Sequence, residues 1–328
     1  MAKYQVSTDR KSRPFYRSWR FVLACVVIVV FGPYFESRLM SPYRAVRSYR
    51  VELSVEVPVG QTDAPLRICC YNIAHGRGLA TGNTQGGSRD ERRSRLSEIA
   101  KLLVSIDADV VVLNEVDFDS TWSYGENQAE FLAKNSGYPF VVEQRNLDFR
   151  FAIGSWRFGN AILSRRPVSN VRLIDLPALK TWEAMLAGHK KSVICDVETE
   201  AGKISVGAVH LSHRSEALRV ASAKRLIELT GAAGDPVVWA GDFNSTPTGY
   251  PHSDEAGAQN AMDVLINSGL VYEPKHTPTT DQLTFRSDAL TRTIDWVLLS
   301  DDCRFLSYEA VDSRLSDHRP VVASFERL

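Results

Sequence analysis

The stretch PVVWAGDFNSTP (residues 236–247) decides the fold class, because a short apolar run ends abruptly in polar residues. The run VVWA is typical of a strand buried on both faces, and the GDFN after it is typical of a turn. Similar runs recur along the chain, bounded by polar or glycine-rich segments. They are LRICCYNIA (66–74), ADVVVLNEVD (108–117), YPFVVEQ (138–144), GNAILSR (159–165), KSVICDVE (191–198), KISVGAVHLS (203–212), RTIDWVLLS (292–300) and PVVASFE (320–326).

Segments with helical spacing lie between these strands. Residues 89–106 and 215–230 repeat leucine and isoleucine at intervals of three and four, and residues 253–268 do so more weakly. Strands and helices alternate from residue 65 to the end without a linker or an internal repeat. The sequence therefore predicts a single α/β domain over residues 65–328.

Composition places the chain among ordinary globular proteins, with 328 residues, 44% hydrophobic and 24% charged. The formal net charge is zero, but the first 20 residues hold six basic residues and one acidic residue. The remainder carries 33 basic against 38 acidic residues, so it has no global attraction for nucleic acid, although a local basic groove stays compatible with it. The five cysteines have no zinc or disulfide spacing and are expected to be small buried hydrophobes.

The N-terminal region predicts a membrane anchor. After the basic tail (1–20), residues 21–35 carry no charge and would span about 22 Å as a helix, which is short of a bilayer core of about 30 Å. The basic flank predicts that the rest of the chain lies outside the cytoplasm. A cleaved signal segment that releases a secreted protein, and a buried core helix, are the alternatives. Residues 36–64 are expected to be a connector, with one strand at 51–57.

Polar residues stand repeatedly where the predicted strands end. Each alone has an ordinary explanation, such as a turn, a solvated edge or a structural histidine. Together they fill the roles of phosphate-ester hydrolysis, which needs a hard cation and a positioned water. Glu115, Asp317 and Asn72 supply oxygen ligands for the cation. Asp242 is suited to orient and deprotonate the water.

The same reaction needs donors aimed at the charge that develops on phosphorus. Asn244, His210 and His318 have suitable side chains. A histidine in this role must be held in one tautomer, and Asp295 is the candidate carboxylate. The sequence has no cluster of histidines or cysteines of the kind that would indicate a zinc site instead.

The series of motifs resembles the endonuclease/exonuclease/phosphatase superfamily, the metal-dependent phosphoesterases that include pancreatic deoxyribonuclease and neutral sphingomyelinases. The matching pieces are YNIAHG (71–76), LNEVD (113–117), GNAILSR (159–165), HLSH (210–213), GDFNSTP (241–247), LTFR (283–286), RTIDWVLLS (292–300) and SDHRPV (316–321). The resemblance implies a four-layer α/β sandwich of two mixed β-sheets flanked by helices, here preceded by the N-terminal hydrophobic helix.

The resemblance also implies a metal site. Glu115 resembles the main Mg²⁺ ligand, with Mn²⁺ as the alternative ion, and Asn72 stands beside it. Asp317 matches the acidic residue assigned to a second metal or its waters.

The remaining matches imply catalytic and substrate-binding roles. Asp242 resembles the residue that orients water, and Asn244 the one that contacts the phosphoryl group. His318, held by Asp295, resembles the histidine at the scissile phosphate. His210 matches a phosphate ligand or general acid. Asn160 matches a residue that contacts substrate phosphate or frames the site.

The sequence therefore predicts a Mg²⁺-dependent phosphoester hydrolase, most simply a phosphodiesterase. Its substrate is nucleic acid, a phospholipid headgroup or a small diester, so an exported nuclease and a sphingomyelinase-like enzyme both stay open. An inactive binding module is the alternative of another class, and no protein partner is implied. Residues 144–158 are expected to form a loop, whose arginines and aromatic residues would suit nucleic acid or would pack on themselves. The glycine-rich residues 76–90 predict a mobile rim.

Overall fold

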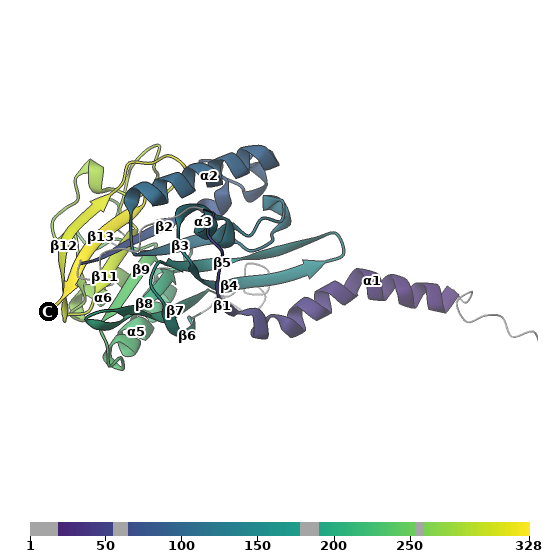
Figure 1. Cartoon of the computed structure of the whole chain (residues 1–328), viewed down its shortest axis with the longest axis horizontal. Helices are drawn as coiled ribbons and strands as arrows, with labels where there is room; N and C mark the ends of the chain where they lie inside the picture. Colours follow the sequence, from purple (N-terminus) through teal and green to yellow (C-terminus); the bar gives the residue numbers. More distant parts are fainter. Residues whose placement is uncertain (1–18, 55–64, 178–189, 254–258) are drawn as a thin grey trace, which may run out of the picture.

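Two β-sheets stacked face to face form the centre of the molecule, and helices cover both outer faces (Figure 1). The structure, a computed structural model, describes residues 19–54, 65–177, 190–253 and 259–328. Apolar side chains fill three cores, one between the sheets and one between each sheet and its helices. The predicted four-layer α/β sandwich is thereby confirmed.

The first sheet has seven strands, and only β2 and β3 pair in parallel. In spatial order its strands are β1 (Val46–Arg50), β4 (Phe140–Phe151), β5 (Gly154–Ser164), β3 (Val110–Asp117), β2 (Leu66–Asn72), β13 (Val321–Arg327) and β12 (Cys303–Ala310).

The second sheet has six strands, and only β8 and β9 pair in parallel. In spatial order its strands are β10 (Val271–Tyr272), β11 (Asp295–Leu299), β9 (Val237–Asp242), β8 (Gly202–His210), β7 (Lys191–Thr199) and β6 (Val168–Asp175).

The flanking helices bury their apolar faces against the sheets. Helices α2 (Arg89–Ile106) and α3 (Gln128–Ser136) cover the seven-stranded sheet, and α5 (Glu216–Gly231) and α6 (Ala261–Asn267) cover the other. Helix α2 begins at Ser88, whose side chain accepts from the backbone of the third helical residue while that residue's glutamate bonds back. The helix over residues 253–268 is shorter than predicted, and residues 254–258 lie outside the described part of the chain.

The N-terminal hydrophobic helix is confirmed as α1 (Trp19–Met40), which projects away from the sandwich (Figure 1). Its 22 residues correspond to about 33 Å, longer than the predicted segment 21–35 and enough to cross a bilayer core. Among the described residues it is the one helix long and apolar enough to do so. Its first turns are exposed, whereas Ser37 near its end is buried against the domain.

Three strand predictions were wrong or incomplete. The connector contains β1 at Val46–Arg50, which pairs with β4, while residues 51–54 are not in a strand and residues 55–57 lie outside the described part. Residues 144–158 are not a loop, because β4 and β5 continue through them as a long hairpin. The edge strands β6, β10 and β12 were not predicted. Strands β6 and β12 are half exposed and lack an apolar run, and β10 has only two residues.

Close packing of the second sheet at Gly207 gives a test of this architecture. A Cβ at this position would lie 2.2 Å from the ring of Trp239, which is fully buried on the paired strand. We expect Gly207→Ala to lower the free energy of unfolding by about 1–3 kcal/mol, measured by urea denaturation. Gly231→Ala, at a helical glycine with open space around it, is the control and should be neutral or stabilising. Equal stabilities of the two variants would contradict this packing.

Candidate functional site

Strand pairing brings the predicted residues to one edge of the sandwich. In the second sheet, Asp242 at the end of β9 lies opposite His210 of β8 and Asp295 of β11. In the first sheet, Asn72 at the end of β2 lies opposite Asn114 of β3. Because both parallel pairs end at the same edge, the sheets present these side chains to one another.

Asn114 and Asn160 form the buried frame beneath the site. The Asn114 side chain donates to Asn160 Oδ1 (2.9 Å) and to the Val209 carbonyl (3.0 Å), and accepts from the Asp242 amide (2.9 Å). The Asn160 amide nitrogen in turn donates to Gln144 Oε1 (2.7 Å) and to the Lys191 carbonyl (3.2 Å). This geometry gives Asn160 a framing position, and a bond to substrate would require one of these contacts to break.

Glu115 enters the site through an irregularity in β3. The register of β3 against β5 shifts between Leu113 and Val116, and Glu115 has a positive φ of 51°. A bulge of this kind redirects a side chain at the cost of local backbone strain. It aims the Glu115 carboxylate at the guanidinium of Arg77, 2.9 Å away.

The Arg77 guanidinium lies between two acidic residues. Its second terminal nitrogen is 3.1 Å from Asp317. Burial acts to lower the pKa of Arg77, but Glu115 and Asp317 raise it overall. Burial acts to raise the pKa of Glu115, but the imidazoles of His75 and His210 and the charge and hydrogen bond of Arg77 bring it well below its usual value. Both groups are therefore charged at neutral pH.

His318 and Asp295 form a buried ion pair. Nδ1 of His318 lies 2.9 and 3.1 Å from the two Asp295 oxygens, which leaves Nε2 directed toward Asp242 at 3.8 Å. Burial opposes the charge, but the Asp295 carboxylate raises the pKa of His318 to about 10. The site thus holds a fixed cationic imidazolium at neutral pH.

Asp242 is the carboxylate least compensated by charge. It accepts from the Asn244 amide (2.9 Å) and from the Asn72 side chain (3.1 Å). Burial raises its pKa to about 7, helped by the Asp295 charge and opposed by His318. A carboxylate with this pKa exchanges protons near neutral pH, as a general base must.

His210 and Lys190 complete the opposite side. The Lys190 ammonium donates to Nε2 of His210 at 2.9 Å. Burial lowers the pKa of Lys190 to about 8, and burial together with the Lys190 charge lowers the pKa of His210 well below its usual value. His210 is therefore neutral at pH 7, and its Nε2 also lies 3.6 Å from Asp242.

Two places at this edge gather ligands that a hard cation accepts. Glu115 and Asp317 already bracket one positive group, the guanidinium of Arg77. One donor atom each from Asp242, Asp295 and His318 lie within 4.8 Å of one another. Since His318 Nδ1 is committed to Asp295, the first place has the more suitable oxygen donors.

All nine predicted site residues meet at this edge through these contacts. They are Asn72, Glu115, Asn160, His210, Asp242, Asn244, Asp295, Asp317 and His318.

The sequence reasoning missed Arg77, His75 and Asn114. His75 lies 3.4 Å from Glu115 and 2.8 Å from Asp117. The sequence held a signal for Asn114, because an asparagine inside a strand buried on both faces must find hydrogen-bond partners.

The loop that carries Arg77 is held in place, in contrast to the predicted mobile rim. Arg92 donates to the His75 carbonyl (3.1 Å) and Arg95 to the Gly76 carbonyl (2.7 Å). Gln128 of α3 also bonds the His75 carbonyl (2.9 Å). The loop is therefore part of the site's framework.

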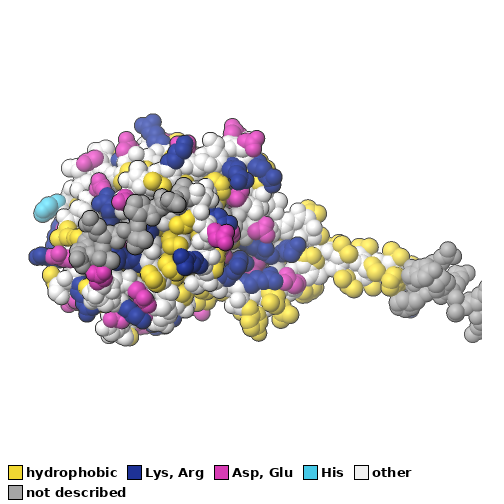
Figure 2. All heavy atoms as spheres, viewed as in Figure 1, with side chains coloured by type: hydrophobic (Ala, Val, Ile, Leu, Met, Phe, Trp, Pro, Cys, Tyr) yellow, Lys and Arg dark blue, Asp and Glu magenta, His cyan; other side chains and the backbone are white. Residues whose placement is uncertain are grey.

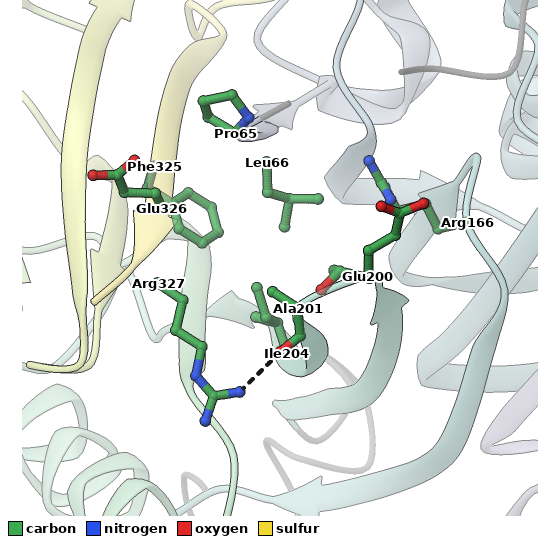
Figure 3. Close-up of a pocket in the computed structure, with 10 residues that line it drawn as sticks. Pro65, Leu66, Arg166, Glu200, Ala201, Ile204, Phe325, Glu326 and Arg327 are labelled. Atoms are coloured by element: carbon green, nitrogen blue, oxygen red, sulfur yellow. Dashed lines mark hydrogen bonds between the residues drawn. The ribbon is translucent and has the colours of Figure 1, made fainter. Parts of the chain in front are cut away.

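A cavity of about 320 Å³ opens at the other end of the sheets (Figure 3). Leu66, Ile204 and Phe325 give it an apolar floor, and Arg327 bonds the Ala201 carbonyl at its rim. None of the nine predicted residues lines it, so it is separate from the site.

The endonuclease/exonuclease/phosphatase family model matches residues 70–318, well over half of the chain. The chain belongs to this family. Its members are phosphoester hydrolases that generally depend on a divalent metal. No curated protein matches the chain.

Several solved structures have the same fold as this chain. A Bacteroides vulgatus endonuclease/exonuclease/phosphatase has a TM-score of 0.61 and 19% identity, covering 81% of this chain and 100% of that one. The human Nocturnin catalytic domain gives 0.58 and 19%, with 88% and 99% covered. The Bacteroides thetaiotaomicron mannosyl-6-phosphatase gives 0.57 and 16%, with 80% and 99% covered. At these identities the likeness concerns the fold alone.

The His318–Asp295 pair leads to a prediction about charge. Replacing Asp295 with asparagine removes the largest of the contributions that raise the His318 pKa, and burial, which acts against the charged imidazole, should then lower it. We expect NMR titration in EDTA to show His318 charged at pH 7 in the wild type and neutral in Asp295→Asn, with His318→Gln assigning the signal.

The same pair sets a pH dependence of stability. Because the folded-state pKa is raised, its stabilising contribution is fully present below pH 6.5 and is lost as pH rises through about 10. If His318 titrated at the same pH in the wild type and in Asp295→Asn, that result would contradict the pairing.

Proposed function

We propose that the chain is a Mg²⁺-dependent phosphoesterase, most simply a phosphodiesterase, that uses water activated at Asp242. One observation carries the proposal. The cationic His318, held by Asp295, faces the same small edge at which Glu115 and Asp317 converge on a positive charge. A phosphate ester with a bound divalent ion needs a cationic group for the phosphate and, beside it, carboxylates for the ion.

Glu115 and Asp317 would hold the metal, with Asn72 beside them, and Mn²⁺ is the alternative ion. The fit rests on the donor chemistry, since both carboxylates are ionisable oxygen ligands from separate segments that already share one cation. When bound, the ion polarises a phosphoryl oxygen and offsets the charge that develops there.

The chain's own side chains would do the remaining work. Asp242, with a pKa of about 7, takes a proton from water as the water oxygen attacks phosphorus. The P–O bond to the alcohol group breaks, and the leaving oxygen takes up a proton. His318 donates from Nε2 to a phosphoryl oxygen, and Asn244 adds a second donor. The Lys190–His210 pair lies on the opposite side as a phosphate contact, or as the donor of the proton that the leaving oxygen takes up, which would come from the Lys190 ammonium. Asn160 frames the pocket from below.

For the substrate we favour a phospholipid headgroup over nucleic acid. Two of the three arginines of residues 144–158 that suggested phosphate tracking are paired with acidic residues, whereas Arg150 is exposed. Arg145 lies 3.5 Å from both Glu143 and Asp148, and Arg157 lies 2.9 Å from Asp148 and Asp119. We also propose that α1 anchors the protein, with the basic tail inside and the catalytic domain outside the cytoplasm. Secretion after cleavage of the segment is the alternative.

Replacing the proposed base tests the mechanism. Asp242→Asn should lower Mg²⁺-dependent hydrolysis of bis-p-nitrophenyl phosphate by about 10²–10⁴-fold, because the water loses its proton acceptor. The measurement uses the full chain in detergent, with EDTA as the metal-free comparison. Asp301→Asn, an exposed carboxylate in the turn after β11, should keep the wild-type rate. An unchanged rate in Asp242→Asn would remove Asp242 from the mechanism.

A substrate panel separates the remaining alternatives. Single- and double-stranded DNA, sphingomyelin, inositol phosphates and simple diesters are compared with wild type and Asp242→Asn. Preferred hydrolysis of DNA would replace the phospholipid assignment by a nuclease. If no compound were hydrolysed, with or without Mg²⁺, the result would favour the inactive binding module.

Arg77 should compete with the metal for its carboxylates. We expect Arg77→Met to tighten Mn²⁺ binding on the order of tenfold, because a like charge leaves the site. Isothermal titration calorimetry of the full chain measures this without any substrate. Arg95→Met is the matched control, since Arg95 holds the same loop through the Gly76 and Gly86 carbonyls but touches neither carboxylate. Weaker Mn²⁺ binding in Arg77→Met would show that Arg77 orders the site instead.

A further inference from the structure

The β4–β5 hairpin carries an apolar tip where a water-exposed turn is ordinarily polar. Its turn is formed by residues 152–153, Ala-Ile, and Ile153 is 87% exposed. Turns in water favour glycine, asparagine and aspartate, because these residues suit the backbone and bond to solvent. The tip therefore lacks the chemistry of a solvated loop.

Behind the tip, aromatic side chains share one face of the hairpin. Phe149 and Trp156 are directly opposite across the strands, with ring centroids 5.6 Å apart, and Phe151 packs on Trp156 at 5.5 Å. Trp156 remains 36% exposed. Partly exposed tryptophan and phenylalanine beside an apolar tip are typical of a surface that meets the lipid interface.

The hairpin is joined to α1. The ring of Tyr34 lies 5.5 Å from that of Phe149, and the Arg150 amide donates to Ser37 Oγ at 3.1 Å. In Figure 1 the hairpin extends along α1 in the direction of that helix's N-terminus. The contacts begin where the exposed apolar run of α1 ends, so the hairpin stands where a bilayer surface would lie if α1 crossed it.

Basic side chains surround this junction. Arg38 near the end of α1 and Arg150 of β4 are exposed there, and Figure 2 shows Lys and Arg side chains, with Asp and Glu side chains among them, where the helix meets the domain. Positive charge next to an apolar segment is attracted to anionic headgroups, by about 1 kcal/mol per residue near the surface.

The site described above lies at the same end of the sheets. Phe158 of the hairpin pairs with Asp117, two residues beyond Glu115, and the strand from Gly154 to Phe158 covers only about 13 Å. The His75 ring contacts that of Phe158 at 5.3 Å and also lies 3.4 Å from Glu115. A bilayer at the hairpin tip would therefore face the opening of the site.

We propose that the β4–β5 hairpin tip enters the lipid interface beside α1 and fixes the catalytic domain with its site toward the membrane. The occupant of this surface is a phospholipid bilayer. The inference rests on the proposed anchoring by α1, and it adds a second contact that sets the orientation of the domain.

The test places an environment-sensitive fluorophore at single cysteines of the full chain in liposomes of phosphatidylcholine and phosphatidylglycerol. Native Cys25 is exposed and reports on α1. Ile153→Cys in a Cys25→Ser background reports on the tip. Leu306→Cys in the same background is the matched control, because Leu306 is an apolar side chain, 47% exposed, on the opposite edge strand β12.

The other thiols should stay unlabelled. All four are buried, and burial raises the pKa of the Cys69 and Cys195 thiols to about 12 and that of Cys303 to about 11. We expect nitroxide-labelled lipids to quench most of the emission at residues 25 and 153, with a blue shift, and to leave residue 306 unquenched.

The outcomes separate the two proposals. Quenching at residue 25 with water-like emission at 153 would overturn the hairpin inference and leave the anchor intact. Water-like emission at both would overturn the anchor and the inference together. Equal quenching at 153 and 306 would contradict the proposed orientation.

Discussion

One buried amide joins the two sheets at the edge where the chemistry lies. The Asn114 side chain uses both its N–H groups and its carbonyl oxygen to connect β3 with β5, β8 and β9. Such a fully satisfied buried group is costly to disturb, because any lost partner would leave a desolvated polar atom. Gly241 makes the approach possible, since a Cβ there would lie 2.8 Å from the Asn114 oxygen and 2.1 Å from the Val209 carbonyl. The position of Asp242 therefore follows from its neighbours on both sides.

Charge balance at this edge explains why one carboxylate differs from the rest. Glu115 and Asp317 have Arg77, and Asp295 has His318, all within about 3 Å. Within the described part of the chain, Asp242 has no cation that close, and its nearest imidazole nitrogens are 3.6 and 3.8 Å away. In a poorly solvated place, an ionised carboxylate without a close partner is unfavourable, so its pKa rises toward neutrality. Different surroundings give neighbouring carboxylates different pKa values. One carboxylate can then accept a proton while the others stay charged.

The sequence was most informative where strands are buried on both faces. Apolar runs predicted nine strands and, through their polar ends, the residues that meet at the site. The edge strands β1, β6, β10 and β12 escaped prediction. Strands β1, β6 and β12 hold exposed, charged positions in place of an apolar run, and β10 has only two residues. Arg77 and His75 escaped for a different reason. Their place beside Glu115 depends on how Arg92, Arg95 and Gln128 fold the loop around its carbonyls, which no local pattern encodes.

The hairpin shows how a local rule can mislead when the surroundings of a segment are unknown. Phe149 and Phe151, then Trp156 and Phe158, are spaced two apart, which is the period of a strand. The prediction of a loop for this segment missed that period. The Ala-Ile turn between the pairs has none of the residues that favour a hairpin in water. Where a sequence breaks such a rule without local compensation, the reason is ordinarily functional. Here the departure occurs at a hairpin that contacts the apolar helix α1, and the proposed lipid surroundings would account for it.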